Sequence, residues 1–235
     1  MEQIKVGVVI VAGGSGSRMG GAIPKQFALV DGEPILVKTI NNFAKAFAGA
    51  QIVVVLPASQ IDFWKNYSAR FRVARHKIVE GGEQRFHSVK NALAKVPDGA
   101  IVAVHDGVRP LVSVGLVKRM FEACETVESL IPVIPSVDTM KVLEKKGDEL
   151  VTVPGASVDR SVLYGAQTPQ IFHSEILKEA YQQPYDTAFT DDASVVEKNG
   201  KNLSYTMGER FNIKITTQDD LVLARAIISL PSFSS

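Results

Sequence analysis

The chain has 235 residues, of which 46% are hydrophobic and 22% charged, with 26 Lys and Arg residues against 25 Asp and Glu residues. This length suffices for a sizeable core, either as one α/β domain or as two small domains. The formal net charge of +1 excludes a strongly basic nucleic-acid-binding surface and an acidic tail, so any anionic ligand must be held by local geometry.

Short apolar runs alternate with helical patterns along the chain. Runs rich in Val and Ile, without polar alternation, are typical of strands buried on both faces of a parallel sheet. Apolar residues at steps of three and four favour helices between them. The alternation predicts a doubly wound, mostly parallel, Rossmann-like α/β sheet with ligands at the carboxyl ends of its strands. In chain order, we expect a strand over 6–12, a helix over 35–47, strands over 52–56 and 101–104, a helix over 114–127 and a strand over 130–134.

Residues 138–165 depart from this rhythm. Two short alternating runs, 140–144 and 150–153, flank the turn-rich residues 145–149, which predicts a β-hairpin. An isolated hairpin is marginally stable in water. This hairpin therefore needs support, either from its own domain or from a symmetric partner chain.

The glycine-rich sequence AGGSGSRMG at residues 12–20 follows the first predicted strand directly. Glycines let backbone N–H groups approach an anion, which indicates a phosphate site. The spacing excludes the dinucleotide fingerprint, because Met19 stands where its last glycine is needed. It also excludes the Walker loop, since Lys25 is preceded by Pro24 and followed by Gln26.

Two cations, Arg18 and Lys25, lie in and just after this loop. Arg18 offers a planar fork of donors and Lys25 a compact charge, which together suit a phosphate chain whose charge redistributes during a reaction. The alternative is an ordinary tight turn with solvated cations. The four histidines show neither a Ser/His/Asp pattern nor zinc-ligand spacing.

Several further motifs occur in a fixed order between residues 5 and 227. The motifs are AGGSGSRMG at 12–20 with PKQF at 24–27, VHDGVRP at 104–110, DTMK at 138–141, VDR at 158–160 with AQTPQ at 166–170, and NIKIT at 212–216. In this combination the sequence resembles the 2-C-methyl-D-erythritol 4-phosphate cytidylyltransferase family, a branch of the sugar-phosphate nucleotidylyltransferases. The resemblance implies transfer of a cytidylyl group from CTP to methylerythritol phosphate, with Mg²⁺, in the non-mevalonate route to isoprenoids. It also implies a homodimer in which residues 138–162 of a single domain, 1–235, form a β-arm that clasps the partner.

The resemblance also assigns roles to residues at the matching positions. Arg18 and Lys25 are then the catalytic cations. The Mg²⁺ ion is held mainly by the CTP phosphates, with Asp106 nearby and no certain protein ligand. The nucleotide-binding residues are Ala12, Gly13, Gly14, Ser15, Gly16, Gly82, Arg85 and Ser88, and the residues that bind the acceptor substrate are Asp106, Arg109, Thr139, Arg160 and Lys214.

Some of these residues have plainer interpretations. Asp106 precedes Gly107 and would suit a turn. Residues 80–88 would suit a loop that leads into a helix. Lys214 alternates with isoleucines in a predicted strand over 212–216, and the polar face of such a strand is commonly exposed to solvent.

The run Thr190-Asp191-Asp192 is typical of a helix start, with Thr190 as the cap and the acids favouring the helix dipole. For that reason we leave both aspartates out of the predicted site.

Two other functions are open. Gly107-Val108 and Ala12-Gly13-Gly14 lean toward the sister family that acts on ribitol 5-phosphate, whereas DTMK and VDR favour methylerythritol phosphate. A non-catalytic nucleotide-binding module is the other candidate. The presence of both Arg18 and Lys25 argues against it, because a binder has less need of two cations aimed at a transition state.

Cysteine use and the apolar runs bear on location. Cys124, the single cysteine, can form no intrachain disulfide, and we expect an inert side chain in a reducing compartment. The apolar run over 6–12 is too short to span a bilayer and leads into glycines rather than a cleavage site. We therefore expect a soluble cytoplasmic protein whose partners include neither membranes nor nucleic acids.

Overall fold

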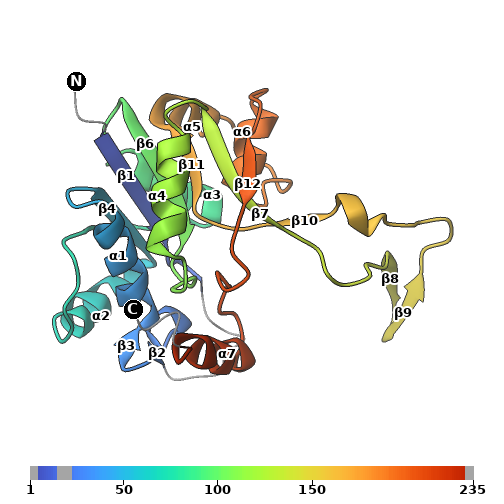
Figure 1. Cartoon of the computed structure of the whole chain (residues 1–235), viewed down its shortest axis with the longest axis horizontal. Coiled ribbons are helices and arrows are strands. Elements are labelled where there is room, and N and C mark those ends of the chain that lie inside the picture. The colour runs from blue at the N-terminus through green and yellow to red at the C-terminus, as the bar shows by residue number, and fades with distance from the viewer. Residues whose placement is uncertain (1–4, 15–22, 231–235) are drawn as a thin grey trace.

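In a computed structural model, the chain forms a sheet flanked by helices, with one long projection (Figure 1). The structure describes residues 5–14 and 23–230. The central sheet consists of β1 (Lys5–Val11), β4 (Gln51–Leu56), β5 (Lys77–Glu80), β6 (Ala100–Asp106), β7 (Ser129–Pro135), β10 (Tyr164–Ala166), β11 (Gln170–His173) and β12 (Tyr205–Met207), and a separate pair consists of β2 (Leu29–Val30) and β3 (Glu33–Pro34).

The central sheet runs in the order β10-β7-β11-β6-β1-β4-β5, and β12 pairs with β7. β1 lies parallel to both β4 and β6, whereas β11 runs antiparallel to β6 and β7. β6 is buried along its whole length, as an apolar strand in a sheet covered on both faces should be. The four strands predicted from unbroken apolar runs all occur, and the mostly parallel α/β architecture is confirmed.

Alternate residues of the strands face two separate cores. Val8 and Ile10 of β1 pack into a core with α1 and α4, whereas Val9 packs into a core with α3, α5 and α6. The division follows from strand geometry, since successive side chains point to opposite faces of a sheet. The helices are α1 (Ile35–Ala46), α2 (Ala58–Ser68), α3 (Arg85–Leu93), α4 (Val114–Ala123), α5 (Ser174–Ala180), α6 (Asp192–Lys198) and α7 (Gln218–Ile228).

Both predicted helices occur, and each ends earlier than expected. α1 ends one residue early, at Ala46. α4 ends at Ala123 because Cys124 is its C-cap, and Thr126 then donates to Ala123 O from both its N–H (3.1 Å) and its hydroxyl (2.9 Å). Cys124 is a buried free thiol, and burial raises its pKa to about 12, which makes it inert as predicted.

Residues 136–163 form an arm that projects from the edge of the sheet (Figure 1). The arm contains the predicted hairpin, with β8 (Leu143–Lys146) paired to β9 (Glu149–Thr152) around Gly147 at φ +65°. A tight hairpin turn needs such a positive φ, which glycine adopts without strain. All of β8 and most of β9 are exposed, so the body of the chain does not cover the hairpin.

Candidate active site

A pocket of about 270 Å³ lies at the carboxyl ends of β1, β5 and β6. This is the edge at which the fold class places its ligands. The pocket is lined by Val11, Ala12, Gly13, Gly14, Lys25, Gln26, Gly82, Glu83, Gln84, Arg85, Ser88, Asp106, Val108 and Lys214.

The glycine-rich loop leaves β1 at this pocket, and the structure describes it as far as Gly14. The Ala12 N–H donates to Val55 O across 2.9 Å, which fixes the start of the loop beside β4. A Cβ on Gly14 would lie 3.6 Å from Lys25 Cε, so the stem of Lys25 lies against this glycine. Three predicted residues lie outside the described part of the chain: Ser15, Gly16 and Arg18.

The loop before α3 closes another side of the pocket. The Gly82 N–H donates to the Ser88 hydroxyl across 3.1 Å, so Ser88 ties this loop to the first turn of the helix. A Cβ on Gly82 would overlap the Cβ of His87, so the backbone here requires glycine. The predicted loop before a helix occurs, but α3 begins at Arg85, so Arg85 and Ser88 lie in its first turn and only Gly82 of the three predicted residues lies in the loop. All three line the pocket.

Asp106, the last residue of β6, lies at the centre of three cations. Its Oδ2 lies 3.0 Å from Lys214 Nζ and 3.3 Å from Arg109 Nε, and its Oδ1 lies 3.8 Å from Arg85 Nε. Burial acts to raise the pKa of the carboxyl, but Arg85, Lys214 and Arg109 outweigh it and hold the pKa well below its usual range. Asp106 also begins a turn, as the plainer interpretation expects, since its carbonyl accepts from the Arg109 N–H. The carboxylate has the separate role of anchoring the three cations.

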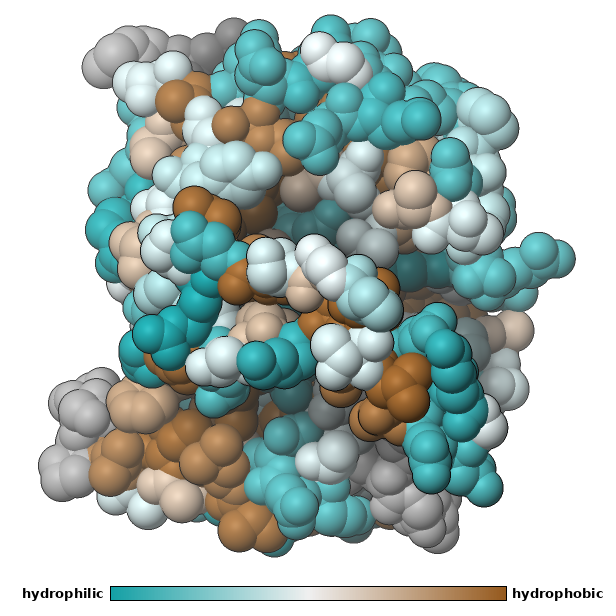
Figure 2. Space-filling view, turned by 90° about the vertical axis from the view of Figure 1, so that its right-hand side faces the viewer, coloured by the Kyte–Doolittle hydropathy of each residue, from teal (hydrophilic) through white to brown (hydrophobic). Residues whose placement is uncertain are grey.

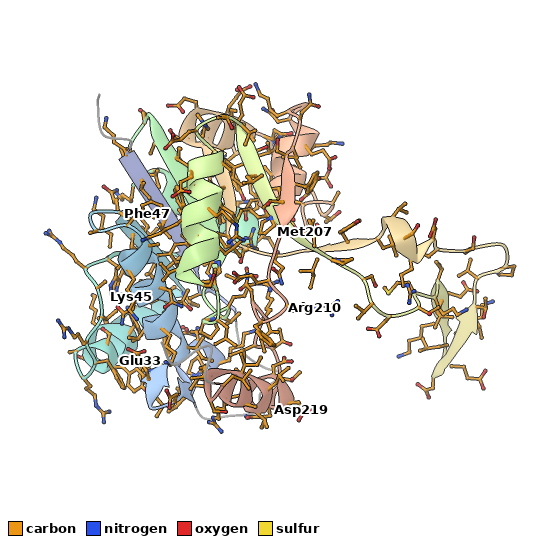
Figure 3. The ribbon with its side chains drawn as sticks, in the orientation of Figure 1. Glu33, Lys45, Phe47, Met207, Arg210 and Asp219 are labelled. Atoms are coloured by element: carbon orange, nitrogen blue, oxygen red, sulfur yellow. The ribbon has the colours of Figure 1, made fainter. Side chains whose placement is uncertain are left out.

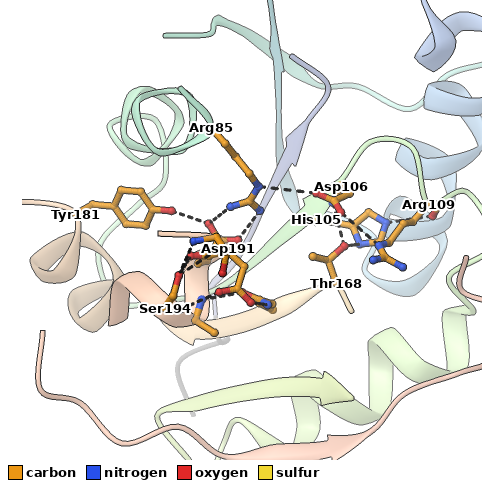
Figure 4. A network of polar contacts seen from close by, with 12 residues as sticks. Arg85, His105, Asp106, Arg109, Thr168, Tyr181, Asp191 and Ser194 are labelled. Atoms are coloured by element: carbon orange, nitrogen blue, oxygen red, sulfur yellow. Dashed lines mark hydrogen bonds and ion pairs between the residues drawn. The ribbon is translucent and has the colours of Figure 1, made fainter. Parts of the chain in front are cut away.

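Arg85 is held from its other side by Asp192, a residue that is not among the predicted site residues. Arg85 Nη1 and Nη2 donate to Asp192 Oδ1 (3.0 Å) and Oδ2 (2.6 Å), and the Tyr181 hydroxyl donates to the same Oδ1 across 2.6 Å (Figure 4). Asp192 is fully buried. Burial acts to lower the pKa of Arg85, but the attraction of Asp192 outweighs it, so the pKa is raised and the guanidinium stays charged.

The prediction that Thr190 caps α6 is wrong. Asp191 is the cap: its carboxylate accepts from the Ser194 N–H (2.9 Å), and the Ser194 hydroxyl accepts from the Asp191 N–H (3.2 Å). A helix start needs one capping carboxylate. The second acid, Asp192, is therefore surplus to the cap, and that surplus is the signal in the sequence that points to another role.

His105 is fully buried beside the pocket and has a structural role. His105 Nε2 donates to Arg109 O, since a carbonyl can only accept, and Nδ1 of the neutral ring therefore accepts from the Thr168 hydroxyl (3.1 Å), which itself accepts from the Asp106 N–H (3.0 Å). This arrangement assigns the ring proton to Nε2, which faces Arg109 O at 3.1 Å. Burial lowers the pKa of His105 to about 4, so the ring is neutral at physiological pH.

Acidification should destabilise the protein through His105. The pKa is about 4 in the folded chain against 6.5 for the exposed group, so between these values the unfolded chain binds more protons and stability falls as the pH falls. Urea unfolding at pH 7 and pH 5 should show a loss of about 2 kcal/mol from this group. A His105→Gln variant should lack this component, and an unchanged pH dependence in that variant would contradict the assignment.

The structure brings together three of the five predicted acceptor-binding residues. Asp106, Arg109 and Lys214 share the cation cluster. Thr139 and Arg160 lie on the arm, are exposed and do not line the pocket of their own chain.

The expected strand over 212–216 is absent, because these residues have no regular secondary structure. Side chains take up backbone groups that a neighbouring strand would otherwise pair: Gln167 donates to Asn212 O, and the Asp220 carboxylate accepts from the Thr216 N–H. Asn212 is fully buried rather than on an exposed face. Lys214 nevertheless reaches the pocket, as the resemblance implies.

The parallel sheet, the glycine-rich loop after β1 and the basic groups at one edge define a nucleotide-binding α/β enzyme of the nucleotidyltransferase class. The family model described as "IspD: 2-C-methyl-D-erythritol 4-phosphate cytidylyltransferase" matches residues 6–230. The chain belongs to this family, and the resemblance read from the motifs is confirmed.

Individual relatives match over nearly the whole chain. A protein from Phocaeicola vulgatus named 2-C-methyl-D-erythritol 4-phosphate cytidylyltransferase is 50% identical over 222 residues, which cover 94% of this chain and 98% of that protein. One of the same name from Bacteroides thetaiotaomicron is 45% identical and covers 96% of this chain and 100% of that protein. The crystal structure of the enzyme of that name from Thermus thermophilus is similar with a TM-score of 0.75 and 31% identity, covering 97% and 100% of the two chains. No helix in the described ranges is long and apolar enough to cross a membrane.

Proposed function

We propose that this protein transfers a cytidylyl group from CTP to 2-C-methyl-D-erythritol 4-phosphate, giving 4-diphosphocytidyl-2-C-methyl-D-erythritol and pyrophosphate. The observation that carries the proposal is the convergence of the glycine-rich loop, Lys25, Arg85 and Lys214 on one pocket, with Arg109 bound to Asp106 behind its lining. That arrangement suits two polyanionic substrates, and it occurs in a chain that matches the family over residues 6–230.

The reaction requires that the two substrates be positioned and that charge in the transition state be stabilised, and it requires no general base. The acceptor phosphate is already ionised at neutral pH, since its second pKa is about 6. One of its oxygens attacks the α-phosphorus of CTP, and the bond from that phosphorus to the pyrophosphate oxygen breaks. Charge then grows on the equatorial oxygens and the leaving group, where Arg18 and Lys25 stabilise it. Residues 12–16 with Gly82, Arg85 and Ser88 hold the nucleotide, and Asp106, Arg109 and Lys214 hold the acceptor.

The proposal includes a Mg²⁺ ion. Mg²⁺ keeps several waters and binds through one or two carboxylates plus substrate phosphates. The pocket offers carboxylates of the kind that Mg²⁺ binds, because Asp106 and Glu83 are among its lining residues. Within the described ranges, no group of three or more His, Cys, Asp and Glu side chains is placed to hold a metal ion. The CTP phosphates would therefore hold the ion, with Asp106 nearby, and when bound it would neutralise phosphate charge.

Methylerythritol phosphate is the acceptor that the relatives favour, since those at 42–50% identity carry its name. Ribitol 5-phosphate is the competing acceptor, because Gly107-Val108 and Ala12-Gly13-Gly14 resemble the sister family that acts on it. Pyrophosphate release should be measured with CTP and each acceptor in parallel. Faster turnover with methylerythritol phosphate supports the proposal. Faster turnover with ribitol 5-phosphate would replace the acceptor and keep the reaction, and no release with either would refute the transfer.

We further propose that the arm joins two copies of the chain into a homodimer. Leu150 and Val162 on the arm are 69% and 70% exposed. Tyr164 of β10 and Met207 of β12, which flank β7 at the base of the arm, are 54% and 56% exposed. Figure 2, which faces the side from which the arm projects, shows brown apolar patches among hydrophilic residues. Exposed apolar side chains on a projecting segment favour an interaction surface. A second copy would supply the support that the hairpin lacks, and it would carry Thr139 and Arg160 toward the partner's pocket.

A variant lacking residues 141–158 should therefore be a monomer. Deletion removes the hairpin together with the exposed side chains of Val142, Leu143 and Leu150, which the proposed dimer would bury. Sedimentation velocity of this variant and of the full chain measures the oligomeric state. A stable dimer after deletion would contradict the role of the arm.

We place the reaction in the cytoplasm. This location is supported by the single free thiol, Cys124, which is buried and unreactive and suits a reducing compartment.

A further inference from the structure

The segment between β12 and α7 brings Lys214 to the pocket without forming a helix or a strand. Met207, Arg210 and Asp219 mark its course in Figure 3. Two nearly fully buried amide side chains contact this segment: Gln167, from the loop before β11, and Asn212, from the segment itself. Buried amides are held strongly only where their hydrogen-bonding groups find partners, so their partners define what they fix.

Gln167 holds the segment through both ends of its amide. Its Oε1 accepts from the Glu209 N–H (3.1 Å), and its Nε2 donates to the carbonyls of Glu209 (2.9 Å) and Asn212 (3.4 Å). A Cβ at position 208 would overlap Gln167 Oε1, so Gly208 permits this close approach.

Asn212 extends the same contacts toward the cation cluster. Its Nδ2 donates to Thr168 O across 2.8 Å, and its backbone carbonyl accepts from Arg109 Nη1 across 2.8 Å. Lys214, two residues further on, lies 3.0 Å from Asp106. The two amide side chains therefore fix a stretch of backbone that accepts a hydrogen bond from one cation, Arg109, and carries another, Lys214.

The contacts of these amides avoid the nucleotide side of the pocket. Neither Gln167 nor Asn212 lines the pocket. In the described part of the chain, neither side chain hydrogen-bonds to residues 12–14 or 82–88. Their influence should therefore reach the acceptor and leave CTP binding unchanged.

We propose that Gln167 and Asn212 are positioning residues that hold Arg109 and Lys214 where the phosphate of the sugar-alcohol acceptor binds. The inference rests on the proposed function. Two buried amides that touch no substrate would thus set the positions of the cations that bind the acceptor.

Gln167→Glu tests the proposal with little change of volume. The variant places a carboxylate oxygen where Nε2 now donates to two carbonyls, so the Glu209 and Asn212 backbone should be pushed away. We expect the KM for methylerythritol phosphate to rise about tenfold or more, with the Kd for CTP alone within about twofold of wild type. Gln182→Glu is the matched control. This variant adds the same charge, and Gln182 is exposed just after α5.

Asn212→Ala provides a second variant that adds no charge, and the same split is expected. Steady-state kinetics gives both KM values, and calorimetry with CTP in the absence of acceptor gives the Kd. Loss of CTP affinity together with acceptor affinity in both variants, or an unchanged acceptor KM, would overturn the proposal. Failure of the proposed function is a separate result, since it would appear as absence of cytidylyl transfer in the wild-type protein.

Discussion

Lys25→Ala is expected to lower kcat by about two to three orders of magnitude, the size of effect seen when one donor to a developing oxyanion is removed. Lys25 lines the pocket, and its stem lies against Gly14 in the glycine-rich loop. A cation that acts on charge formed in the transition state should affect turnover more than ground-state binding. The KM for CTP should therefore change much less than kcat. The same result is expected for Arg18→Ala.

Rapid-quench or steady-state pyrophosphate release measures this effect. Lys65→Ala is the matched control, because Lys65 lies on the exposed face of α2 and pairs with Asp62 across 3.1 Å, away from the pocket. Near-normal turnover of the Lys25 variant would refute its catalytic role. It would also favour the non-catalytic binding module, which needs the loop but not the cation.

The fold was predictable wherever the pattern is local in sequence. An unbroken apolar run such as 101–104 needs cover on both faces and so indicates a central strand. The hairpin around Gly147 is equally local, because turn chemistry and flanking alternation lie within a few residues. The end of α4 was not predictable in this way, since the apolar spacing continues through Val127 while the Thr126 hydroxyl turns the chain at Ala123.

The site was predictable where a motif is contiguous. Gly82 and Ser88 meet across six positions, where a loop enters α3, and the motif contains both. Asp192 was not predicted as a site residue because it pairs with Arg85 across 107 positions of sequence. Only the packing of α6 beside α3 brings the two residues together. Lys214 was predicted to lie on a strand because polar and apolar residues alternate over 212–216. The same alternation occurs here in a segment in which side chains, rather than a neighbouring strand, bind some of the backbone groups.

The charge balance of the whole chain hides a local excess. Three cations converge on Asp106 from three separate segments, although Lys and Arg exceed Asp and Glu by only one residue in total. A neutral protein can hold polyanions in this way, because fields add within a cleft and are screened between distant surface groups.

Asp192→Asn is expected to weaken CTP binding and to destabilise the fold. Asp192 is fully buried, and it accepts two hydrogen bonds from Arg85 and one from Tyr181. Removing its charge leaves the guanidinium facing Asp106 at 3.8 Å, and a buried pair broken on one side typically loses about 3 kcal/mol of stability. Because Arg85 lines the pocket, its displacement should raise the KM for CTP about tenfold or more.

Two variants separate the loss of stability from the loss of function. Tyr181→Phe keeps both charges and removes one hydrogen bond to a carboxylate, so urea unfolding should show a smaller loss of about 1.5 kcal/mol. The double variant Arg85→Met with Asp192→Leu removes both buried charges, so it should regain stability relative to Asp192→Asn without regaining CTP affinity. If the double variant bound CTP normally, Arg85 would be only a partner for Asp192. The pair would then belong to the architecture of the sheet edge rather than to the nucleotide site.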